Sequence, residues 1–150
     1  MLFGAAIGSS VKNAPLAVIL ALLGHYFLDL FPHIEYLDGV ENSITKLKSA
    51  ERSKKIKDLV KVFLDFCLGI LLIFLFSRNF PIIYLCAFIA IVPDGLTVIH
   101  SLFPKLGLTL HHYIHGTTIH YLTKQKNFPV YWKILTQVIV VIVSVILLKI

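Results

Sequence analysis

Apolar residues occur along the chain in four long runs that are separated by polar segments. The runs cover residues 15–31, 59–76, 81–103 and 130–150. A helix needs about 20 predominantly apolar residues to cross the hydrocarbon core of a bilayer. Each run reaches or approaches this length, so the pattern predicts an all-α integral membrane protein with a bundle of about four transmembrane helices.

Composition supports lipid rather than water as the solvent of these helices. Of the 150 residues, 57% are hydrophobic and only 15% are charged, whereas soluble domains carry roughly 25% charged residues. The length predicts a single helical membrane domain over residues 1–150. Residues 1–13 lack the basic start of a signal peptide, because Lys12 follows their apolar part. We expect this segment to extend the first helix or to lie at the interface.

Basic residues predict the orientation of the bundle. Four spans place residues 32–58 and 104–129 on one side, and the turn 77–80 with both termini on the other. Most of the lysines belong to the first side. The positive-inside rule therefore predicts a plasma-membrane or inner-membrane protein with cytoplasmic long loops and both termini outside. Tyr131 and Trp132 are expected to mark the headgroup level where the last span begins.

Ionisable residues stand inside these apolar runs, where each costs a few kcal/mol unless it is paired, metal-bound or hydrated. His25 and Asp29 are four residues apart and therefore lie on one helix face. His33 would continue this face, but Pro32 ends or bends the helix before it. A carboxylate with two imidazoles is a ligand set for a divalent metal, with Asp29 binding the ion or orienting a histidine. The alternative is a His–Asp hydrogen bond that only locks helix packing.

A second motif, Pro93-Asp94-Gly95, interrupts the third run about 13 residues, or roughly 20 Å, from its start. We expect Pro93 to kink the helix, and Gly95 to allow close approach of another backbone. An acid at a break in a membrane helix is typical of a site that faces a hydrated cavity. The alternative is an ordinary helix end.

The third motif consists of three histidines within five residues. His111 and His115 are spaced i,i+4, and His112 and His115 are spaced i,i+3, so either pair can bind one metal from one helical face. Histidine and carboxylate ligands without thiolates favour zinc, and they also suit iron or manganese. Alternatively, these histidines would lie at the headgroup level without binding a metal.

All three motifs fall near the cytoplasmic end of the predicted bundle, although they come from different helices. We therefore predict one metal site there. His33 and His111 are the candidates for a further ligand or a general acid or base. The predicted metal ligands are His25, Asp29, Asp94, His112 and His115.

At these residues the chain resembles the membrane-bound metal-dependent hydrolase family, small inner-membrane proteins distantly linked to zinc-dependent phospholipase C and P1 nuclease. The family carries a Ser/Gly-His-x3-Asp helix, a membrane-level Pro-Asp and a His-x2–3-His pair. Their counterparts here are Gly24-His25-x3-Asp29, Pro93-Asp94, and His112 with His115. The order differs, because the family usually places its Pro-Asp and paired histidines before the His-x3-Asp helix. The resemblance implies metal-dependent hydrolysis.

We predict from these observations a membrane-embedded hydrolase that acts on a phosphoester or lipid-like ester at the cytoplasmic headgroup level, with membrane lipids as partners. A metal or proton transporter is one alternative, but residues 70–76, 82–90 and 138–148 are almost wholly apolar, which disfavours a relay across the bilayer. The other is a non-enzymatic membrane partner protein with a structural metal site. The basic residues lack interleaved aromatic residues, so no nucleic-acid-binding module is predicted.

Overall fold

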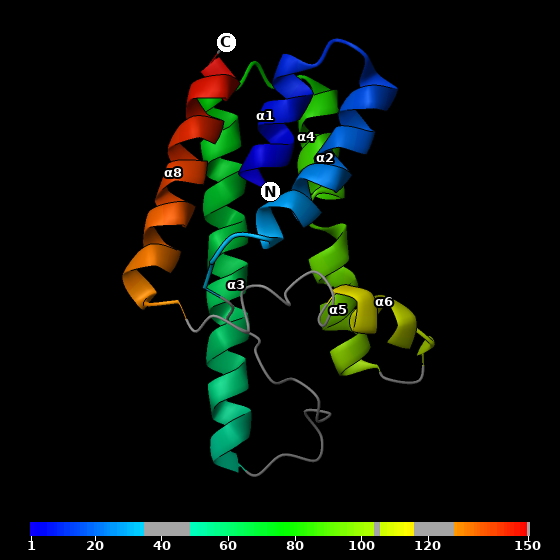
Figure 1. The fold of residues 1–150 in the computed structure, drawn as a ribbon, viewed down its shortest axis with the longest axis vertical. Helices are drawn as coiled ribbons and strands as arrows, with labels where there is room; N and C mark the ends of the chain where they lie inside the picture. Colours follow the sequence, from blue (N-terminus) through cyan, green and yellow to red (C-terminus); the bar gives the residue numbers. More distant parts are fainter. Residues whose placement is uncertain (35–48, 104–105, 116–127, 150) are drawn as a thin grey trace.

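The computed structural model describes residues 1–34, 49–103, 106–115 and 128–149. Regular structure in these ranges is helical throughout, which confirms the all-α prediction for the described residues. Figure 1 shows α3 and α8 side by side, with the shorter helices beside their upper halves and α5 and α6 lower down. In chain order the helices are α1 (Leu2–Ser10), α2 (Ala14–Asp29), α3 (Ser49–Phe76), α4 (Pro81–Ile89), α5 (Val92–Leu102), α6 (Thr109–Tyr113) and α8 (Val130–Lys149).

Two helices are long and apolar enough to cross a membrane, namely Ile56–Phe76 within α3 and the whole of α8. A third span results only if α4 and α5 are taken together, and these are bent by 42° at a short break. The apolar helix α2 has 16 residues, which is short of the about 20 that a span needs. The four predicted spans are therefore reduced to two or three in the described residues.

The break between α4 and α5 confirms the expectation that Pro93 kinks the run over residues 81–103. Pro93 has no N–H group to donate to the carbonyl of Ile89, so the hydrogen-bond ladder of α4 cannot continue past that residue. Accordingly, α4 ends at Ile89 and α5 begins at Val92. The break leaves Asp94 in the first turn of a new helix.

The first segment of the chain forms a helix of its own, so the expected extension of the first apolar run is wrong. Val11 has an extended conformation after α1, and the side chain of Asn13 caps α2 by accepting a hydrogen bond from the Leu16 N–H at 3.0 Å. Pro15 occupies the first turn of α2, where its missing N–H costs nothing. The chain therefore reverses, and α2 returns beside α1 (Figure 1).

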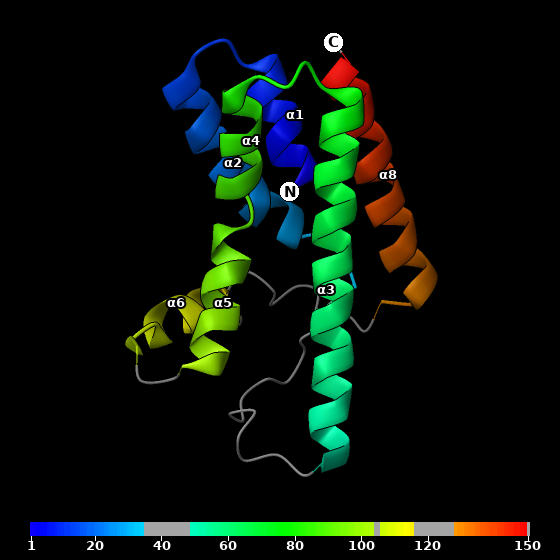
Figure 2. The ribbon, with the colours of Figure 1, turned by 180° about the vertical axis from the view of Figure 1, so that it is seen from behind.

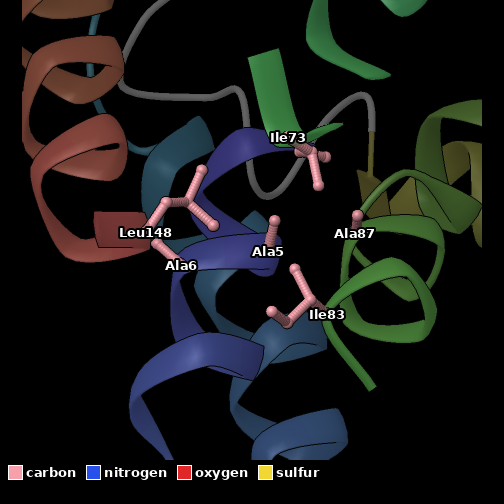
Figure 3. Packing of buried hydrophobic residues seen from close by; sticks show 6 residues of the cluster. All are labelled: Ala5, Ala6, Ile73, Ile83, Ala87 and Leu148. Atoms are coloured by element: carbon pink, nitrogen blue, oxygen red, sulfur yellow. The ribbon is translucent and has the colours of Figure 1, made fainter. Parts of the chain in front are cut away.

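Small residues on α1 let it pack at the centre of the helices. Ala5 and Ala6 are fully buried in one cluster with Ile73 of α3, Ile83 of α4 and Leu148 of α8 (Figure 3). A Cβ atom added at Gly4 would lie 2.5 Å from the Cβ of Ala90 and 2.6 Å from the carbonyl oxygen of Cys86. The close approach of α1 and α4 thus requires glycine at this position.

The two long helices allow depths to be compared along the bundle. They run in the same direction, with the C-terminus and the turn after α3 at one end (Figures 1 and 2). The ammonium group of Lys149 lies 5.0 Å from the ring centre of Phe76. Because each helical residue rises about 1.5 Å, Val130, nineteen residues before Lys149, is level with Lys57, nineteen before Phe76. Both helices thus begin their apolar length at the same depth.

The packing predicts that alanine destabilises the protein at one glycine and has little effect at another. Gly4→Ala should lower the stability of the protein by about 1–3 kcal/mol, because the added methyl group overlaps α4. Gly95→Ala is the matched control, since no atom of the described residues lies within 4 Å of a Cβ at Gly95. Within the described part of the chain, the expected close approach of another backbone to Gly95 is therefore not found. Thermal unfolding of both variants in detergent, followed by circular dichroism, measures the difference; equal melting temperatures would contradict it.

Candidate metal centre

Four side chains from three parts of the chain meet where α2 ends, α5 begins and α6 ends. Their ligating atoms all lie within 4.8 Å of one another, and as a group they can hold a metal ion. Two come from α2, one from α5 and one from the turn that follows α6. The four residues, called the His/Asp cluster below, are His25, Asp29, Asp94 and His115.

The helix α2 supplies two members of the cluster through its i,i+4 spacing. His25 Nε2 lies 3.1 Å from Asp29 Oδ2, and both residues are buried. The last turn of α2 is reinforced by the hydrogen bond from the Phe31 N–H to the Leu28 carbonyl. The ring of His33 contacts the carbonyl oxygen of Phe31 through Nδ1 at 2.9 Å. His33 is not a member of the metal-binding group.

The helix α5 supplies Asp94 from its first turn, where the helix dipole favours a negative charge. The side chain of Asp94 is 63% exposed, unlike the other three members of the cluster. Its Oδ1 lies 3.8 Å from His25 Nε2 and 3.7 Å from His115 Nε2. Asp94 therefore forms the open side of the cluster.

The short helix α6 is fixed to α5 by a histidine that was predicted to be catalytic. His111 Nε2 donates a hydrogen bond to the Pro93 carbonyl oxygen at 3.0 Å, directly beside Asp94. The His111 ring also stacks on the ring of His115, with the centroids 5.5 Å apart. These contacts favour a positioning role for His111 over the predicted acid–base role, because they hold His115 next to α5.

His115 completes the cluster from the turn after α6. Its Nε2 lies 3.1 Å from His25 Nε2 and 3.3 Å from Asp29 Oδ2. The two imidazole rings are nearly parallel, with centroids 5.4 Å apart. Tyr26, which the sequence reasoning missed, has its ring edge-on to both histidines at 5.3 Å and 5.9 Å. Its position next to His25 in the chain was the only available signal.

The distances within the cluster fit a tetrahedral ion of the size of zinc. Ligands at about 2.0–2.1 Å from such an ion lie about 3.3–3.4 Å from one another. The three buried ligating atoms, on His25, Asp29 and His115, are separated by 3.1 Å, 3.1 Å and 3.3 Å. Two imidazoles and a carboxylate also form a donor set that zinc accepts. The three buried groups thus have the spacing of one tetrahedral face, and Asp94 lies slightly farther out.

The structure therefore brings four of the five predicted ligands together. The fifth, His112, lies in α6, but its side chain is outside the described part of the chain. The two predicted acid–base residues, His33 and His111, each contact a backbone carbonyl group and are not members of the metal-binding group.

Comparisons with known proteins do not assign the chain to a family. No protein-family model, curated protein sequence or solved structure matches it. The resemblance of its motifs to the membrane-bound hydrolases therefore stays a prediction, and function is argued from the His/Asp cluster.

The cluster predicts which substitutions abolish metal binding. Asp29→Asn keeps the size of the side chain but removes the charge that holds a cation, and His115→Ala removes an imidazole ligand. Each should weaken zinc binding by roughly 100-fold or more, because even the loss of an outer-shell partner costs 10–100-fold. His100→Ala on α5, which is outside the group, is the control. Zinc titration with elemental analysis of the purified protein measures the effect; unchanged affinity for Asp29→Asn would limit Asp29 to packing.

Proposed function

We propose that the protein is an integral membrane hydrolase that uses a divalent metal, zinc above all, to cleave a phosphoester or lipid-like ester. One observation carries this proposal. Three buried ligating groups, on His25, Asp29 and His115, have tetrahedral spacing within 3.3 Å of one another. Burial of such groups without a cation would be costly.

Exposed apolar side chains support the membrane part of the proposal. Large residues are exposed along most of α3 and α8, including Phe63, Phe74, Ile139 and Ile146. Soluble monomers rarely expose contiguous apolar surface of this extent. Lipid tails would cover these helices, whose apolar lengths begin at the same depth.

The arrangement of ligands favours catalysis over a purely structural ion. A structural zinc site uses four protein ligands, whereas a catalytic site uses three and leaves one position open. The three closely spaced groups are buried, and Asp94 lies 0.4 Å or more farther out at the exposed side. We therefore place the open position beside Asp94, which accepts a proton from the water that occupies it.

The reaction follows from these roles. A bound zinc ion supplies a Lewis acid that polarises the phosphoryl oxygen and lowers the pKa of water. Asp94 takes one proton as the water oxygen bonds to phosphorus, and the bond from phosphorus to the leaving alcohol breaks. The protonated Asp94 carboxyl group then gives this proton to the leaving alcohol oxygen, which restores the carboxylate. His111 holds the carbonyl of Pro93 and so keeps Asp94 in place.

The depth of the cluster favours a substrate that resides in the membrane. The hydroxyl group of Thr136 donates to the carbonyl oxygen of Pro32, and Thr136 lies six residues, or about 9 Å, inside the start of α8. Asp29 lies before Pro32 in the chain, at the end of α2. The ester must therefore reach somewhat below the headgroup level, which suits a lipid better than a soluble metabolite.

The core beyond the cluster disfavours a transporter. The buried side chains between α1, α3, α4 and α8 in the described residues are apolar, among them Ala5, Ile73 and Ile83. Ser144 is buried in α8, but its hydroxyl group bonds to the Val140 carbonyl of the same helix. A proton or cation relay across the bilayer would need polar groups to continue along this path.

The proposal predicts a separation of turnover from metal binding at Asp94. Asp94→Asn should retain zinc but lower the hydrolysis of phospholipid in mixed micelles by roughly 10²–10⁴-fold, the usual contribution of a general base. Asp58→Asn is the control, since this acid pairs with Lys61 at 2.9 Å on α3. The measurement is headgroup release per bound zinc. Full zinc occupancy without any hydrolysis by the unaltered protein would instead support a structural metal site.

A further inference from the structure

The helix α6 and the turn after it have two chemically different faces. His111 and His115, four residues apart, point toward Pro93 and the His/Asp cluster. The other face carries Leu110, Tyr113 and Ile114, which share a helix face through their i,i+3 and i,i+4 spacing. These three side chains, called the apolar face of α6 below, are exposed, Leu110 by 71% and Tyr113 by 63%.

Two residues of the segment between α5 and α6 also expose large apolar side chains. Phe103 and Leu106 are both about as exposed as Tyr113. An apolar surface of this size next to a polar site marks contact with a membrane or a protein. The two faces of α6 are thus suited to a helix that lies between the polar cluster on one side and lipid on the other.

The depth of α6 indicates which of these partners it meets. Both views show α6 at the height at which α8 begins (Figures 1 and 2). The first turn of α8 carries Tyr131 and Trp132, which are exposed and in ring contact at 5.9 Å. Tyrosine and tryptophan are enriched where a membrane protein crosses the headgroup level. The apolar face of α6 therefore lies at the depth of this aromatic boundary.

Charge in the neighbouring sequence points to lipid as well. Lys105 precedes α6, and Lys124 and Lys126 follow it before α8 begins. Basic residues near a membrane surface gain about 1 kcal/mol each from anionic headgroups. Apolar side chains flanked by lysines are characteristic of helices that lie in the lipid interface.

We propose that the apolar face of α6 lies in the boundary between lipid headgroups and acyl chains, so that the substrate of the cluster enters sideways from the bilayer. This inference rests on the proposed function and narrows its substrate to the phosphoester of a membrane lipid. His115 is then a ligand presented by an interfacial element. A lipid beside α6 has its headgroup next to Asp94, which forms the open side of the cluster.

Tryptophan fluorescence tests this placement. The chain has a single tryptophan, so Trp132→Phe provides a background into which Tyr113→Trp or Leu110→Trp is introduced. The full-length variants are reconstituted in phosphatidylcholine–phosphatidylglycerol vesicles whose acyl chains carry bromine either near the headgroup or near the chain end. Both reporters should lose fluorescence to the shallow bromines and be protected from aqueous iodide. Since both native residues are exposed, tryptophan should not disturb packing, and zinc content checks this.

A third reporter, placed in α8, distinguishes a wrong position for α6 from a wrong membrane proposal. Ile139→Trp in the same background lies near the middle of α8 on an exposed position, and the deep bromines should quench it. Quenching of Ile139→Trp, with both α6 reporters quenched only by iodide, would overturn the interfacial position of α6 and leave the membrane proposal standing. Ile139→Trp unquenched by either lipid would overturn both. Protection of the α6 reporters from lipid and iodide alike, together with chemical cross-linking of two copies, would replace lipid with a second chain.

Discussion

Two imidazoles and two carboxylates must lie close together for this arrangement of helices to be stable. In an apolar setting the three buried groups, on His25, Asp29 and His115, lose their hydration, and Asp29 and Asp94 in addition repel each other. The two histidine Nε2 atoms lie between these carboxylates, at 3.1–3.8 Å from them. A divalent cation would neutralise both acids at once, so the groups are far less costly together than apart.

α1 packs between the helices that carry the His/Asp cluster and so connects the cluster to the rest of the fold. α1 contacts both α2, which carries His25, and α4, which leads into Asp94. A Cβ at Gly24, the residue before His25, would lie 2.9 Å from the ring of Phe3 on α1. α1 therefore approaches α2 beside a ligand, and it approaches α4 at Gly4. Small residues along this helix determine how far apart the two halves of the cluster lie.

Local spacing predicted much of the site but little of its supporting structure. His25 with Asp29 followed from the helical repeat, and the helix break before Asp94 followed from Pro93, because both depend only on neighbours in the chain. The central position of α1 could not be predicted from the sequence. Small apolar residues are compatible both with an extension of the next helix and with a separate buried helix. Likewise, the hydrogen bond from His111 to the Pro93 carbonyl joins residues 18 apart, and no local pattern indicates such a contact.

The position of α6 links metal binding to conformation. Among the described residues, none of α6 belongs to the clusters of buried apolar residues formed by the other helices. The polar face of α6 contacts α5 and the His/Asp cluster through His111 and His115. One of these contacts is a single hydrogen bond, worth roughly 0.5–1.5 kcal/mol, and the other is the approach of His115 to the cluster. A cation that binds His25, Asp29 and His115 together favours the docked state of α6 by its differential affinity for that state. The ion proposed to activate water would therefore also hold α6, the helix proposed to border the substrate, in place. Docking of α6 and binding of the metal would then occur together.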